Sequence, residues 1–250
     1  MTPQPISATR STPLGRWWLR NRWEDLAFVH HAYDPAIVQA LLPTGLRVDT
    51  FDGDAYVSLI PFRMTDAAPR FLPAVPWLST FAETNVRTYV VDSAGNRAIW
   101  FMSLEASRLP VVAGARWFLG FPYIWGRLMI DEGVDDGGAW RRYVTAERRW
   151  PRSPDSTTRL TIQIGDRIDE PSDRDVFLTA RWGTVAQWPM HTGRLRHHPV
   201  DHPEWGLHEA SLREYESDAF EAGGLPSPVS EPIVRWSDHT IARFARPAGV

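Results

Sequence analysis

Short apolar runs rich in β-branched and aromatic residues recur along the chain, a pattern typical of strands. Asp52-Gly53 is a tight-turn sequence between Leu46–Phe51 and Ala55–Phe62, so it predicts a hairpin. Asn85–Val91 and Ala98–Leu104 predict a second hairpin, joined by a polar turn at residues 92–96. Further strands are predicted at Trp140–Arg148, Thr158–Ile164, Val176–Trp182, Gly193–His197, Gly206–Tyr215, Ile233–Trp236 and Thr240–Phe244.

Two segments have helix signals instead. Asp34–Pro43 predicts a short helix, with Asp34 as its N-cap and Pro35 in its first turn. The apolar segment Val111–Leu119 predicts a buried helix that ends at Gly120. Because strands outnumber helices, the pattern favours a mainly β (α+β) protein, built as an antiparallel barrel or sandwich with a few covering helices.

Polar and proline-rich segments predict the loops and the limits of the domain. Thr65–Leu78 is rich in proline and predicts a loop over one end of the sheet, and residues 131–138 and 152–156 predict exposed turns. Residues 1–16 lack the apolar core of a signal peptide and are expected to form a flexible tail. We expect residues 17–250 to be one domain, because β-barrels of ~200–250 residues commonly fold as one unit.

The composition restricts the class of function. The 250 residues are 43% hydrophobic and 23% charged with a formal net charge of -3, as in an ordinary soluble globular domain. This near-neutral balance provides no basic surface for a phosphate backbone, so we expect no nucleic-acid partner. No apolar run reaches the ~18–20 residues that cross a bilayer, so we expect a cytoplasmic protein without a membrane partner.

Two residue types are missing from the chain. Without cysteine it has no disulfide, no thiolate metal site and no cysteine nucleophile. All 27 basic side chains are arginine, since the sequence contains no lysine. A guanidinium forms no imine with a carbonyl, so Schiff-base catalysis by lysine and lysine-anchored pyridoxal phosphate are excluded. The nucleophile elbow, the P-loop and Gly-x-Gly-x-x-Gly are also missing, so we expect no nucleotide or flavin cofactor.

The histidines and the tryptophans each have two possible roles. The histidines of residues 191–208 could ligate zinc or iron, but their spacing fits no metal motif, and a polar loop is the favoured interpretation. They are His191, His197, His198, His202 and His208. His30 and His31 point to opposite faces of a strand, so at most one of them reaches a cavity. The 13 tryptophans suit either core packing, which we favour, or an aromatic-lined cavity.

Three blocks of the sequence carry a family resemblance. They are Arg22–His31 with the following helix and Gly45–Gly53, then Phe81–Val90, and then Trp100–Ala106 continuing through Ala115-Arg116 to Phe121-Pro122-Tyr123. Together they resemble the YqjF-like domain-of-unknown-function family. The resemblance continues through Phe177–Trp182 and His202–Leu207, so it extends over nearly the whole chain from about Trp17.

That family is similar, more distantly, to acetoacetate decarboxylase and its relatives, which implies a closed antiparallel β-barrel around a small interior cavity. In the decarboxylases a reactive lysine follows proline in the pattern Arg, five residues, Pro, Lys, Lys, with a glycine two positions further on. Here Arg116 is followed, after five residues, by Pro122, Tyr123, Ile124, Trp125 and Gly126. The frame is kept and both lysines are replaced, so the resemblance implies the cavity without the acetoacetate decarboxylase reaction.

The same resemblance implies which side chains face the cavity. Glu83 falls where the decarboxylases keep an acidic residue, and Arg22, preceded by Asn21, falls where they keep a substrate-binding arginine. Tyr123 takes the place of the imine-forming lysine. Their second acidic residue has no counterpart in Ser58-Leu59-Ile60-Pro61. The candidate set is therefore Glu83 and Tyr123 as catalytic residues, with Arg22, Arg116, Asn85 and Arg87 as substrate-binding residues.

These side chains predict acid/base chemistry without a cofactor or a metal. Desolvation raises the pKa of a carboxyl group and a nearby guanidinium lowers it, so Glu83 is expected to act as a general base near neutral pH. Tyr123 would donate a proton to a developing oxyanion, and an arginine would bind a carboxylate through two hydrogen bonds. The set suits enolisation, dehydration, cyclisation or lyase chemistry on a small keto or carboxylic acid.

Three other interpretations stay open. Glu83 and Arg87 also suit a structural ion-pair network, because such networks perturb pKa values without catalysis. A non-catalytic barrel would bind a small apolar or acidic molecule in the same cavity. A metal site in residues 191–208 is the third alternative. Exposed sheet edges favour a homodimer in each case.

Overall fold

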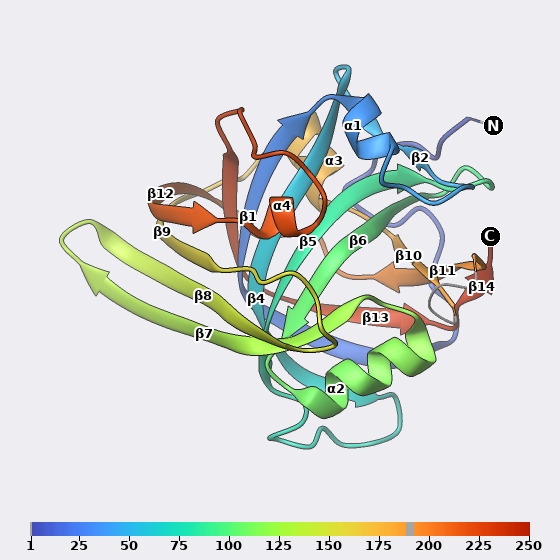
Figure 1. Cartoon of the computed structure of the whole chain (residues 1–250), viewed down its shortest axis with the longest axis horizontal. Helices are drawn as coiled ribbons and strands as arrows, with labels where there is room; N and C mark the ends of the chain where they lie inside the picture. The colour runs from blue at the N-terminus through green and yellow to red at the C-terminus, as the bar shows by residue number, and fades with distance from the viewer. Residues whose placement is uncertain (1, 189–192) are drawn as a thin grey trace.

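The computed structural model describes residues 2–188 and 193–250. It is mostly β, as predicted, and the strands form one sheet of 14 strands among the described residues, with a few short helices beside it (Figure 1). The strands are β1 (Trp17–Tyr33), β2 (Arg47–Val48), β3 (Thr50–Phe51), β4 (Asp54–Pro69), β5 (Phe81–Val91), β6 (Arg97–Ala106), β7 (Tyr123–Asp135), β8 (Gly138–Trp150), β9 (Thr158–Arg167), β10 (Gly183–Gln187), β11 (Leu195–Asp201), β12 (Leu207–Ser217), β13 (Ile233–Ala245) and β14 (Ala248–Gly249). The helices are α1 (Pro35–Gln39), α2 (Leu109–Gly114), the π-helix η1 (Ala115–Leu119), α3 (Asp173–Thr179) and α4 (Ala219–Ala222).

The sheet runs in the order β14-β11-β10-β6-β7-β8-β9-β12-β13-β1-β4-β5-β2, with β3 beside β4. Two further pairings, β5 with β6 and β11 with β13, join strands that are distant in this order. β6 runs parallel to β7 and β10, whereas the other ladders of the described chain are antiparallel. The prediction of an antiparallel sheet is therefore wrong at β6. The chain leaves β6 through α2 and η1 before β7, and such a crossover permits a parallel pair.

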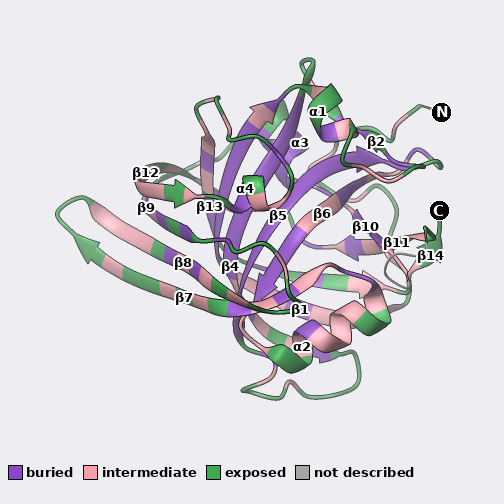
Figure 2. Cartoon of the chain, in the orientation of Figure 1, coloured by how far each residue is buried: buried purple, intermediate pink, exposed green. Residues whose placement is uncertain are grey.

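The long central strands bury side chains on both of their faces (Figure 2). On β4, Val57 and Leu59 belong to a core cluster that also contains residues of β8, β9 and α4. The alternate residues Ile60 and Phe62 belong to a second cluster on the opposite face. Because side chains alternate along a strand, β4 separates a closed core from the face on which the cavity lies.

The predicted turns and caps are confirmed where a short-range signal specifies them. Asp34 caps α1 by accepting a hydrogen bond from Ala36 N at 2.8 Å. Asp52 and Gly53 have φ angles of 52° and 92°, the left-handed pair that a tight hairpin turn requires. The hairpin of β5 and β6 is also present, and its turn is tied together by Asp92.

The predicted strand Val176–Trp182 is wrong, because this segment begins inside α3. Ser172 and Asp175 form a capping box, which starts a helix directly before the β-branched and aromatic residues. The helix then buries Phe177 and Leu178 against Tyr56 and Tyr89. A capping signal thus prevails over strand-like composition in this segment.

The segment predicted as a buried helix is helical but only partly buried, since Val112 is buried and most of its neighbours are half-buried. Val111–Leu119 lies within α2 and η1, and Gly120 ends it with a φ of 77°. Trp117 and Phe118 are 73% and 77% exposed, however. Only part of the surface of α2 and η1 therefore packs against the rest of the protein.

Other differences concern strand limits. The strand β4 extends through Pro69 into the predicted loop, because it stays paired with β1 as far as Leu19. The two predicted strands at the C-terminal end are one strand, β13, and the predicted turn at residues 131–138 is shorter because β7 and β8 continue into it. Strands β7 and β10 were not predicted. No helix in the described part of the chain has the length and apolar character needed to cross a membrane.

Candidate active site in an apolar cavity

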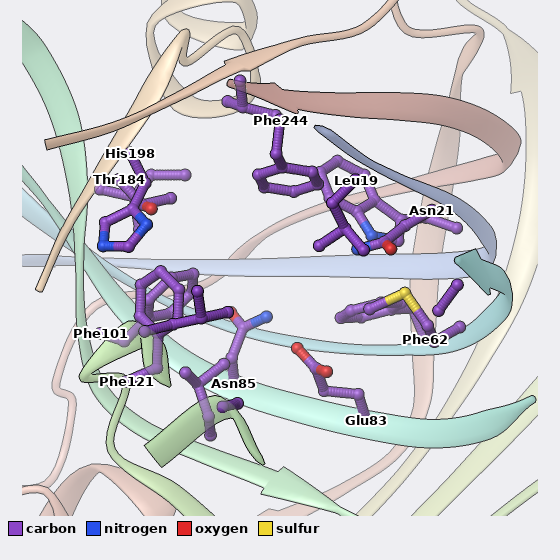
Figure 3. Close-up of a pocket in the computed structure, with 18 of the residues that line it drawn as sticks. Leu19, Asn21, Phe62, Glu83, Asn85, Phe101, Phe121, Thr184, His198 and Phe244 are labelled. Carbon is purple, nitrogen blue, oxygen red and sulfur yellow. The ribbon is translucent and has the colours of Figure 1, made fainter. Parts of the chain in front are cut away.

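A cavity of about 410 Å³ lies among β1, β4, β5, β6, β10, β11 and β13, with η1 beside it (Figure 3). Most of its wall is apolar, and its tryptophan and phenylalanine members are Trp18, Trp23, Phe62, Phe81, Phe101, Phe118, Phe121, Trp205 and Phe244. Tryptophan therefore lines the cavity as well as packing in the core, where Trp236 lies. A cavity of this size with a few polar groups among aromatic rings is typical of a small-molecule site.

Strand β5 places a row of polar side chains along the cavity wall. Successive side chains point to opposite faces, so Glu83, Asn85 and Arg87 share one face, and all three line the cavity. Glu83 and Asn85 are both labelled in Figure 3 on the same side of the cavity. The intervening Thr84 points away and forms a hydrogen bond of 2.8 Å with Thr145 on β8. One strand thus supplies an acid, an amide and a guanidinium to one surface.

Glu83 and Tyr123 are joined by a hydrogen bond between their side chains. Tyr123 Oη donates to Glu83 Oε2 at 2.8 Å, and Glu83 is 3% exposed. Desolvation raises the pKa of Glu83 to about 8, although the hydrogen bonds from Tyr123 and Asn85 lower it. Burial and the neighbouring carboxyl raise the pKa of Tyr123 well above its usual value. At neutral pH the phenol is therefore a proton donor and the carboxyl is mostly protonated.

The turn after η1 determines where Tyr123 lies. At Gly120 a Cβ would lie 2.3 Å from Gln187 O, so the close approach to β10 and the positive φ both require glycine. Arg116 Nη1 donates to Tyr123 O at 2.6 Å and fastens the start of β7. Arg116 therefore binds the main chain, and it is not among the residues that line the cavity.

Arg22 also lies outside the cavity lining. On β1, Asn21 and Trp23 line the cavity, so Arg22 points to the other face. There its Nε donates to Glu24 Oε1 at 2.6 Å. Of the predicted set, the structure brings together Glu83, Tyr123, Asn85 and Arg87, and it leaves out Arg22 and Arg116.

Two arginines line the cavity, and one of them was not predicted. Arg181 Nη1 donates to Asp49 Oδ2 at 2.8 Å, and Asp49 also pairs with Arg97. Arg87 Nη2 donates to Leu178 O at 3.3 Å. Within residues 2–188 and 193–250, Arg87 has no carboxylate within ion-pair distance, so the alternative of a Glu83–Arg87 ion pair is not found there.

His198 and His202 also line the cavity, as neutral rings. Burial lowers the pKa of each to about 4. The ring of His202 lies 4.7 Å from that of Trp182 and 4.8 Å from that of Trp205. Among the described residues no three His, Asp or Glu side chains gather as a metal site, and His191 lies outside them. Neither His30 nor His31 belongs to the described lining.

The sequence did not assign six polar lining residues to the cavity, namely Asn21, Thr179, Arg181, Thr184, His198 and His202. Alternation along β1 was a usable signal for Asn21, since Leu19, Asn21 and Trp23 have the same parity. No comparable signal pointed to Arg181, because it follows a helix that was predicted as a strand.

Comparison with known proteins gives a family and a fold. The DUF2071 family, described as an uncharacterized conserved protein, matches residues 20–240. The uncharacterized protein YqjF of Bacillus subtilis (strain 168) is 30% identical over 227 residues, which are 91% of this chain and 90% of YqjF.

Solved structures with the same fold are enzymes of low sequence identity. An acetoacetate decarboxylase-like enzyme from Sphingomonas wittichii RW1 is similar with a TM-score of 0.65 and 17% identity, over 96% of both chains. The enduracididine biosynthesis enzyme MppR, complexed with the condensation product of pyruvate and imidazole 4-carboxaldehyde, is similar with a TM-score of 0.63 and 12% identity. That similarity covers 93% of this chain and 88% of MppR. At 12% and 17% identity, these two comparisons show a shared fold and not a shared reaction.

Proposed function

The chain belongs to the DUF2071 family, and we propose that it is a cofactor-independent acid/base enzyme acting on a small keto or carboxylic acid. Glu83 is the acid/base residue in this proposal, and Tyr123 is the proton donor. Asn85 and Arg87 contact the substrate from the same strand. A non-catalytic protein that binds such an acid in this cavity is the second candidate, and the largely apolar wall favours it.

The observation that supports catalysis most is the Tyr123–Glu83 hydrogen bond inside the cavity. A pKa of about 8 lies close to neutral pH, and proton transfer is most efficient when the catalytic pKa lies near the operating pH. A carboxyl group in a structural ion pair would have a cation beside it. Glu83 has instead a neutral phenol and a neutral amide, so its proton can leave and return.

The pair suits enolisation of a carbonyl acid. The ionised Glu83 carboxylate takes a proton from the carbon next to the carbonyl, and the C–H electron pair moves to form the enolate. Tyr123 Oη then donates a hydrogen bond to the enolate oxygen. If the enolate is conjugated with a β,γ double bond, Glu83 returns its proton to the γ carbon and the double bond moves to the α,β position. If the β carbon carries a hydroxyl group, the enolate electron pair forms the new double bond as the C–O bond breaks, and the proton held by Glu83 leaves with the hydroxyl group as water. With no lysine in the chain, the lysine imine route to the same carbanion is closed.

Two features support an enclosed site for this chemistry. Relatives in fold are enzymes, and one of them, MppR, was solved with pyruvate and with a pyruvate-derived product.

We also propose that β1, β4, β5, β6, β10, β11 and β13 close into a barrel. Its support is that each of these strands pairs with the next and β13 pairs with β1. A closed wall would keep water from Glu83 and strengthen its interactions.

Deuterium exchange at the carbon next to the carbonyl tests the proposal. The protein is incubated in D₂O with pyruvate, 4-oxopentanoate, 6-oxoheptanoate and 7-oxooctanoate, in which the carbonyl lies at increasing distance from the carboxylate, and exchange is followed by NMR. We expect catalysed exchange of at least one acid, rising from pH 6 to 8 as Glu83 ionises, and a loss of at least about 100-fold in Glu83→Gln. Glu132→Gln, at a side chain that is 58% exposed, is the matched control. Equal exchange by wild type and Glu83→Gln would refute catalysis by Glu83, and bound acids that never exchange would favour the binding protein.

A further inference from the structure

The two lining arginines both lie beside the ring of Tyr89. The guanidinium carbon of Arg87 lies 5.8 Å from the centre of the Tyr89 ring, and that of Arg181 lies 4.8 Å from the same centre. Tyr89 Oη and Arg87 Nη2 both donate to Leu178 O. The guanidinium of Arg87 is therefore directed toward Tyr89, which lies farther from Glu83 along β5.

Both guanidinium groups keep unused donors although they are buried. Arg87 is 8% exposed and Arg181 is 3% exposed. Within the described chain, Nε of Arg87 and both Nε and Nη2 of Arg181 have no hydrogen-bond partner. A buried donor without a partner costs free energy, more so in a charged group, so these atoms are poised to bind acceptors that enter the cavity.

This end of the cavity also carries uncompensated positive charge. The single carboxylate of Asp49 is shared between Arg97 and Arg181. Arg87 has no ion-pair partner among the described residues, and the burial of His202 keeps that ring uncharged. The end of the cavity at Arg87 and Arg181 therefore has more cationic than anionic side chains, which favours an anionic ligand.

We propose that Arg87 and Arg181 bind the carboxylate of an elongated, largely apolar acid, whose other end reaches Glu83 and Tyr123 between the aromatic walls. This inference rests on the proposed function and specifies its substrate class. On an extended strand Glu83 and Arg87 are about 13 Å apart at their Cα atoms, at ~3.3 Å per residue. A molecule of the size of pyruvate cannot contact both ends. The substrate has several bonds between its carboxylate and its reacting carbon, and aryl or alkyl groups against Phe62, Phe101 and Phe121.

Binding of unreactive acids tests this assignment without turnover. The probes are phenylacetate, 4-phenylbutanoate and 6-phenylhexanoate, each compared with its primary amide, by isothermal titration calorimetry on the full chain at pH 7. We expect the two longer acids to bind at least tenfold more tightly than their amides. Each added methylene should raise the affinity by up to about fourfold as the chain fills the apolar wall.

Arg87→Gln should abolish the preference for acid over amide and leave the affinity for the amides within about twofold. Arg87→Lys, which keeps the charge, should restore part of the preference if the first variant is unstable. The matched control is Arg159→Gln, at an exposed ion pair with Glu216 on the sheet surface. The proposal is overturned if acids and amides bind equally to wild type, if Arg87→Gln keeps the preference, or if phenylacetate binds as tightly as 6-phenylhexanoate.

Failure of this inference can be distinguished from failure of the proposed function. Titration of unreactive acids reports the anion site and deuterium exchange reports catalysis, so the two measurements are independent. If acid preference is present and deuterium exchange is absent, the anion site stands and catalysis fails. If exchange depends on Glu83 but acids and amides bind alike, the catalytic proposal stands and the anion site is refuted.

Discussion

Two glutamates on neighbouring strands, Glu83 on β5 and Glu105 on β6, are buried to the same degree but have opposite surroundings. They are 3% and 1% exposed. Glu83 faces the cavity and accepts a hydrogen bond from Tyr123. Glu105 is paired in register with Thr84, on the other face of the sheet, and forms an ion pair with Arg148 on β8.

The two carboxyl groups differ in the groups that counteract the effect of desolvation on their pKa. Burial raises the pKa of both, but at Glu105 the Arg148 guanidinium counteracts it, whereas at Glu83 only neutral hydrogen-bond donors do so. An ion pair inside a protein is stable only as long as both partners remain. A carboxyl beside a phenol can bind a proton without leaving a cation unpaired beside it. The face of the sheet, rather than the degree of burial, therefore distinguishes the structural glutamate from the candidate catalytic one.

Removing each carboxyl in turn tests this distinction with the largest expected effect. Glu105→Ala leaves Arg148 buried without its partner and should lower the free energy of unfolding by about 3–5 kcal/mol. Glu83→Gln replaces a mostly protonated carboxyl by an amide of the same shape and should change it by less than about 1 kcal/mol at pH 6. Urea denaturation at pH 6 measures both variants. Equal losses would show that the two glutamates have the same structural role.

The sequence predicted the elements that short-range signals specify. The N-cap at Asp34, the turn at Asp52-Gly53 and the second hairpin depend on neighbouring residues, so they could be recognised locally. The strand partners of β6 could not, because parallel pairing with β7 and β10 depends on how distant segments pack. The exposed Trp117 and Phe118 are a related case, since apolar composition does not tell which side of a helix meets the sheet.

For the candidate site, the sequence indicated residues of β5 that line the cavity, and two arginines, Arg22 and Arg116, that do not belong to its lining. The family resemblance placed Glu83 and Tyr123 at one cavity, and both line the cavity of the structure. Arg22 lies one position from the lining residue Asn21, and one position along a strand moves a side chain to the opposite face. Arg181 comes from a segment whose secondary structure was mispredicted, so its place in the cavity lining could not be recognised from the sequence.

The pH dependence of stability is the second test. The pKa of Glu83 rises from 4.5 to about 8 on folding, so the native state binds the proton more tightly than the unfolded state. Its contribution to stability is complete below about pH 4.5 and is lost as the pH rises toward 8, with a slope of about 1.4 kcal/mol per pH unit. Glu83→Gln should remove this slope. Urea denaturation at pH 5, 6.5 and 8 measures it, and parallel curves for wild type and variant would contradict the raised pKa.

A smaller effect is expected when Tyr123 loses its hydroxyl. The Tyr123 hydrogen bond lowers the pKa of Glu83, so Tyr123→Phe should raise that pKa further, by about one unit for a hydrogen bond to a charged group. The Glu83 carboxyl stretch in infrared difference spectra against Glu83→Gln, recorded from pH 6 to 10, reports the change. An unchanged or lowered pKa would mean that the phenol does not stabilise the ionised carboxylate.

Arg22 provides the smallest expected effect and the clearest contrast with Arg87. Its guanidinium pairs with Glu24 on the outer face, and the side chain is 37% exposed, so the pair is screened by solvent. Arg22→Gln should change the free energy of unfolding by no more than about 0.5 kcal/mol and leave the preference for acids over amides as in wild type. The same titrations with 4-phenylbutanoate and its amide measure that preference. If Arg22→Gln abolished it and Arg87→Gln did not, the carboxylate would bind at the position that the family resemblance implies, and the distinction between the two faces of the sheet would not hold for the cations.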